Sequence, residues 1–97
     1  MENVKKIGDT EYVLKLFPTM TGLGIVNKLE RQGFAPEVVL EVVTKGAAIG
    51  SVGIDEKKFN KHFQGKYAEL MELFAEILKH NKMFPEEEEG NAKDSEE

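Results

Sequence analysis

The chain has 97 residues, enough for one domain, and its lack of cysteine excludes a disulfide framework and a thiolate metal site. Of the net charge of −5, residues 86–97 carry −6 (seven acidic residues and Lys93), so residues 1–85 carry +1. A body so near neutrality lacks the basic field that binds nucleic acid. No stretch approaches the roughly 20 apolar residues that span a bilayer. We expect a soluble cytoplasmic protein with neither nucleic-acid nor membrane partners.

The N-terminal stretch alternates in the manner of a β-strand. Tyr12, Leu14 and Leu16 are separated by single residues, which predicts a strand over about 11–17. A second strand over 3–7 would pair with it as a hairpin, because Gly8, Asp9 and Thr10 are typical turn residues. Pro18 ends the extended run.

Two helices should follow. The first begins at Thr19 or Thr21, each able to cap a helix, and runs to about Gln32 before Gly33. Its expected buried side consists of Met20, Leu23, Val26 and Leu29. The second runs from Pro36 to about Gly46. Its four valines favour a strand, but its polar residues recur at helical spacing, so a helix is the better interpretation.

Residues 46–53, GAAIGSVG, are small and rich in glycine, which predicts a loop or hinge. Asp55 is a suitable N-cap for a short helix over about 55–64. The longest amphipathic stretch covers 66–81, where apolar residues recur at steps of three and four: Tyr67, Leu70, Met71, Phe74, Ile77 and Leu78.

These elements predict a mainly α fold, namely a domain over residues 1–85 with about four helices and a short N-terminal strand or hairpin. Residues 86–97 contain almost no apolar surface to offset the entropy of ordering them, so we expect a disordered acidic tail.

No motif indicates catalysis, a cofactor or a metal. Gly22-Leu23-Gly24 precedes Asn27 rather than a third glycine, and no P-loop lysine pattern follows. His62 and His80 are the only histidines and match no ligand spacing. Ser51 and Ser95 lie outside any nucleophile-elbow context. We therefore expect a protein that is not an enzyme and works by binding.

The binding surface is expected on the last helix, whose apolar stripe is larger than a chain of this size should cover alone. Methionine adapts to varied partner side chains, and a large aromatic group after the last helix must fold back or meet another molecule. The predicted contact residues, for a client protein or a second copy of the chain, are Leu73, Phe74, Ile77, Met83 and Phe84.

The order of these segments resembles the tail assembly chaperones of long-tailed bacteriophages. The residues that carry the resemblance are Leu16 to Pro18, Thr21 to Leu29, Phe63 with Gly65, Leu70 to Leu78, and Asn81 with Phe84. The resemblance implies a small helical protein of the host cytoplasm that coats and solubilises the tape measure protein before tail-tube subunits assemble around it. It also implies that a longer form can arise by frameshifting.

A different class of protein fits the same features. A small inhibitor or regulatory adaptor could capture one target protein, with the acidic residues 86–97 contacting a basic patch on that target. Removing these residues would weaken such an inhibitor and its salt sensitivity, whereas a chaperone that uses an apolar surface would mainly lose solubility.

Overall fold

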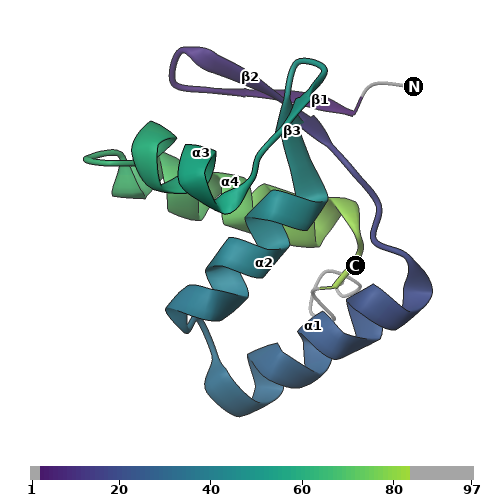
Figure 1. Cartoon of the computed structure of the whole chain (residues 1–97). Coiled ribbons are helices and arrows are strands. Elements are labelled where there is room, and N and C mark those ends of the chain that lie inside the picture. The colour runs from purple at the N-terminus through teal and green to yellow at the C-terminus, as the bar shows by residue number, and fades with distance from the viewer. Residues whose placement is uncertain (1–2, 84–97) are drawn as a thin grey trace, which may run out of the picture.

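The structure, a computed structural model, describes residues 3–83. In these residues four strands and four helices follow one another (Figure 1). The chain starts with the strands β1 (Val4–Ile7) and β2 (Thr10–Leu14) and the helices α1 (Thr19–Gln32) and α2 (Pro36–Gly46). It continues with the strands β3 (Ala47–Ile49) and β4 (Val52–Gly53) and the helices α3 (Glu56–His62) and α4 (Tyr67–His80).

The four strands form one antiparallel sheet in the order β1-β2-β3-β4. Tyr12 pairs with Ile49, and Leu14 pairs with Ala47, so the second hairpin continues the first. Gly50 takes the positive φ of 61° that the tight turn between β3 and β4 requires. The predicted mainly α class is therefore wrong. The fold is α+β, because the segment predicted as a loop over 46–53 is a hairpin that joins the N-terminal strands.

The sheet and helices α2 and α4 enclose one hydrophobic core. α4 packs against α2 and against β1 and β2, and in Figure 1 it crosses behind α2 below the sheet. The core side chains of α4 are Leu70, Leu73, Phe74, Ile77 and Leu78. They meet Tyr12 and Leu14 of β2 and the valines of α2. The sheet supplies cover that a purely helical fold would lack, so Leu70, Phe74, Ile77 and Leu78 of the predicted stripe are buried within the chain. Tyr67 and Met71, which belong to the same predicted stripe, remain exposed.

The outer helices sit at opposite sides of this core. α3 packs against α2, while α1 lies near the end of α4 (Figure 1). α1 packs mainly on α2, and Ile25 is its one fully buried residue. A salt bridge of 2.6 Å between Lys28 and Glu41 also joins the two helices. The predicted disorder of residues 86–97 concerns a segment outside the described residues.

Candidate protein-binding groove

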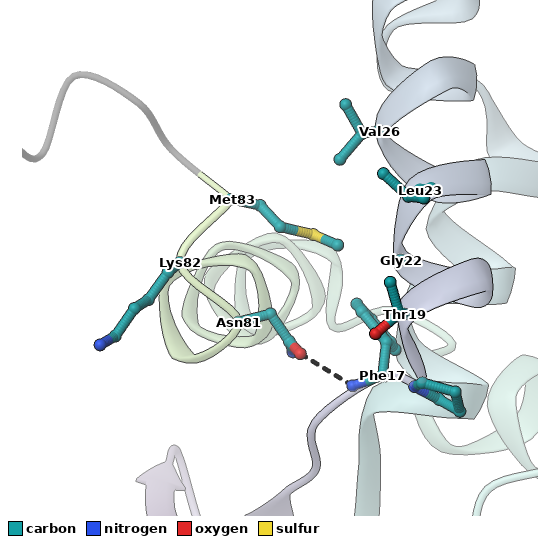
Figure 2. A pocket seen from close by; sticks show the side chains of 9 residues that line it. Phe17, Thr19, Gly22, Leu23, Val26, Asn81, Lys82 and Met83 are labelled. Atoms are coloured by element: carbon teal, nitrogen blue, oxygen red, sulfur yellow. Dashed lines mark hydrogen bonds between the residues drawn. The ribbon is translucent and has the colours of Figure 1, made fainter.

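A groove of about 440 Å³ separates the first half of α1 from the end of α4 (Figure 2). One wall is α1 with the segment before it, and the other is the turn that follows α4. The lining residues are Phe17, Pro18, Thr19, Gly22, Leu23, Val26, Asn81, Lys82 and Met83. Lys82 is the one charged residue in this set, and its side chain points away from α1 in Figure 2. The lining therefore offers apolar contact and very little charge.

Asn81 fixes the distance between the two walls. Its Oδ1 accepts a hydrogen bond of 2.8 Å from the backbone N–H of Phe17. Its Nδ2 donates to the carbonyls of Lys15 and Ile77, both at 3.0 Å. One side chain thus ties the end of α4 to the segment that enters α1. Proline at position 18 leads directly into this helix, whose first residue is Thr19.

The end of α4 places Met83 in the groove. The Met83 N–H donates to the Leu78 carbonyl at 2.9 Å, and the Lys82 N–H donates to the Lys79 carbonyl at 2.9 Å. These two bonds form a Schellman motif, in which the residue at the left-handed position is usually glycine. Here that residue is Lys82, with φ of 58°. The turn directs the Met83 side chain toward α1 (Figure 2), where its methyl group lies 3.4 Å from the place a Cβ on Gly22 would occupy.

The face of α1 beside the groove is apolar and exposed. Met20 is 78% exposed and Leu23 is 57% exposed, and Leu16, just before the helix, is 68% exposed. The sequence predicted Met20 and Leu23 on the buried side of this helix, and the structure corrects this. The reason is that α1 packs mainly on one neighbour, α2, so the narrow side around Ile25 and Leu29 is enough to anchor it.

The predicted contact residues of the last helix divide into three groups. Leu73, Phe74 and Ile77 are at most 2% exposed and belong to the core of the chain itself, so they offer no surface to a partner in this fold. Met83 is half-buried and lines the groove. Phe84 lies outside the described residues. The sequence interpretation did not include Leu16, Met20, Leu23 and Val26 among the contact residues. The spacing of Met20, Leu23 and Val26 did indicate an apolar helix face, but it could not show whether that face is buried or exposed.

A second hollow, of about 480 Å³, lies on α3 and is lined by Asp55, Lys57, Lys58, Lys61 and His62. Beneath it the Tyr12 hydroxyl lies 2.8 Å from His62 Nε2. Burial lowers the pKa of His62, and the charges of Lys66 and Lys58 lower it further, while Glu69 acts in the opposite direction. Burial also raises the pKa of Tyr12. A neutral imidazole can accept the hydrogen bond of the buried tyrosine, so this pair has a structural role.

Neither hollow has the groups of a metal site. Over residues 3–83, no three histidine or acidic side chains come together as ligands.

Within the same part of the chain, none of the helices has the length and apolar character needed to cross a membrane. Comparisons of the chain with models of protein families, with curated proteins and with solved structures find no match.

Proposed function

We propose that this protein is a tail assembly chaperone of the long-tailed phage type, which binds helical segments of the tape measure protein in the groove between α1 and α4. The observation that carries the proposal is the position of the resembling segments. Leu16 to Pro18 and the first half of Thr21 to Leu29 follow each other closely in the sequence, whereas Asn81 comes more than 50 residues later, and residues of each line the groove or border it.

The chemistry of the groove suits an amphipathic helix. Such a helix docks through apolar side chains spaced by three and four residues, and the exposed Met20 and Leu23 with Met83 offer matching apolar contacts. Met83 in the groove and Met20 beside it on α1 allow the surface to adapt to different client side chains. A tape measure protein is long and offers many helical segments, so modest affinity at each groove is sufficient to keep it covered.

The proposal is tested by the solubility of the client. A tape measure protein from the genome that encodes this chain is co-produced with the wild type or with a variant, and the soluble fraction is measured. Leu23→Glu places a charge in the groove at an exposed helical position. Because a buried leucine contributes about 1.5–3 kcal/mol, we expect affinity to fall by roughly tenfold or more and the client to precipitate.

The matched control is Tyr67→Glu. Tyr67 is also a large exposed residue on a helix, 69% exposed, but it lies at the start of α4, far from the groove. This variant should keep the client soluble. If both variants behave alike, or if Leu23→Glu keeps the client soluble, the groove is not the client site.

A further inference from the structure

The outer surface of α3 is basic and lacks ionic partners. Lys57, Lys58 and Lys61 line the hollow on this helix, and Lys66 is the residue just before α4. All four are exposed, and none forms a salt bridge with another described residue. This differs from α2 and α4, where Lys45 and Lys79 each pair with a glutamate on their own helix.

The nearby carboxylates Asp55, Glu56 and Glu69 form no salt bridge with these lysines. Asp55 accepts a hydrogen bond of 2.8 Å from the backbone N–H of Lys58 and so caps α3. Glu69 of α4 lies against Gly8 in the turn between β1 and β2. Glu56 is left as the one acidic neighbour in the first turn of the helix.

The same chain carries a complementary charge. Glu86 to Glu89 are four consecutive glutamates, and residues 86–97 together carry −6, whereas residues 1–85 carry +1. We propose that the acidic block Glu86 to Glu89 of one copy binds the basic surface of α3, formed by Lys57, Lys58, Lys61 and Lys66, on a second copy. The protein would then self-associate by an electrostatic contact that is separate from the client groove.

The reach of the chain favours a second copy over the same copy. α4 has 14 residues, which corresponds to a length of about 21 Å. Met83 follows the end of this helix, while Lys66 directly precedes its first residue. Three residues, from Met83 to Glu86, span at most about 10 Å, and six residues, to Glu89, span at most about 20 Å. The block is therefore too short to reach Lys66 in its own molecule and to bind the whole basic surface there.

The contact predicts weak, salt-dependent association. Exposed lysine–glutamate pairs contribute little individually and are screened by salt, so several pairs must act together. Sedimentation equilibrium of the full chain without any client, at low ionic strength, should give an average mass that rises above 10.9 kDa with concentration. Added sodium chloride should return the mass to that of the monomer.

Two variants locate the contact. Lys58→Gln with Lys61→Gln, or Glu86→Gln through Glu89→Gln, should each weaken self-association at least about fivefold. Lys6→Gln with Lys15→Gln is the matched control for the lysine variant, because it removes the same two positive charges from exposed positions away from α3 and should leave association nearly unchanged. Two wild-type copies can make two such contacts, each between the acidic block of one copy and α3 of the other. A mixture of the lysine variant and the glutamate variant should make only one of them, because only the lysine variant keeps its glutamates and only the glutamate variant keeps its lysines.

Three results would overturn the proposal. The first is a monomer mass at every concentration at low ionic strength. The second is association that survives both charge removals or falls equally in the control. The third is an NMR result: the α3 amide resonances shift when Glu86 to Glu89 are replaced by glutamine, and the shift is the same at every protein concentration. Such a result would mean that the acidic block binds α3 of its own chain. None of these measurements contains a client, so the proposed chaperone function stands or falls separately.

Discussion

Asn81 and Phe17 are 64 residues apart in the sequence and are joined by a hydrogen bond of 2.8 Å from the Phe17 backbone N–H to the Asn81 Oδ1. The same amide group donates to Lys15 and Ile77. Asn81→Ala removes all three bonds and leaves the N–H of Phe17 without its partner. We expect the free energy of unfolding to fall by about 2 kcal/mol. Urea denaturation measures this. Asn27→Ala, on the exposed side of α1, is the control and should be near neutral.

Gly46 is required by the contact between α2, α4 and the segment before α1. A Cβ at this buried position would collide with the Ile77 side chain and would lie 3.1 Å from two ring atoms of Phe17. Gly46→Ala should therefore destabilise the fold by about 1–3 kcal/mol. Gly24→Ala makes the same change on α1, where nothing lies within 4 Å. It should stabilise by up to about 1 kcal/mol through helix propensity. Equal melting temperatures for the two variants would contradict this packing.

Lys82 holds a backbone conformation that glycine adopts without strain. Its φ of 58° belongs to the left-handed position of the Schellman motif that ends α4. Lys82→Gly should raise the free energy of unfolding by about 0.5–1 kcal/mol. Lys79→Gly, inside the last turn of α4, should lower it by a similar amount. The melting temperatures of the two variants test this prediction. A lower melting temperature for Lys82→Gly than for the wild type would show that the lysine side chain stabilises the fold by more than its backbone conformation costs.

Glu41 links α1 to α2 in a pH-dependent way. Its hydrogen bond from Lys28, at 2.6 Å, is the main cause that lowers its pKa from the ordinary 4.5. Because the folded pKa is the lower one, the ion pair stabilises the fold above pH 4.5, and this contribution is lost as the pH falls through the folded pKa. Glu41→Gln should cost roughly 0.5–1 kcal/mol near neutral pH, and its stability should converge with that of the wild type in acid. Glu30→Gln, on the exposed side of α1, should show no such gap.

The longer helices could be predicted because each shows its period over at least three turns, and the short α3 because Asp55 is a recognisable N-cap. The hairpin of β3 and β4 could not be identified by its period, because strands of three and two residues are too short to display one. Its specification is non-local, since β3 pairs with β2, more than 30 residues earlier. One local signal was present: Ile49 and Val52 are separated by Gly-Ser, a pair that favours a two-residue turn.

The candidate site depended on this missed hairpin. Without the sheet, the stripe of α4 has too little cover, which made Leu73, Phe74 and Ile77 candidate contact residues. With the sheet in place they are core residues, and the exposed apolar surface moves to α1. The sequence could show that Met20 and Leu23 share a helix face. It could not show which face would meet α2, because the packing of α1 on α2 is a tertiary contact that the helical period does not specify.

The central claim is that the groove between α1 and α4 binds a helical client. Its most direct test is to record amide NMR spectra of the chain while a helical peptide from a tape measure protein is added. The account predicts shifts in residues 19–26 and 81–83. These shifts should be lost in Gly22→Leu, which fills the groove, and kept in Gly24→Leu, whose side chain enters open space. Shifts confined to other elements, or equal binding by both leucine variants, would contradict it.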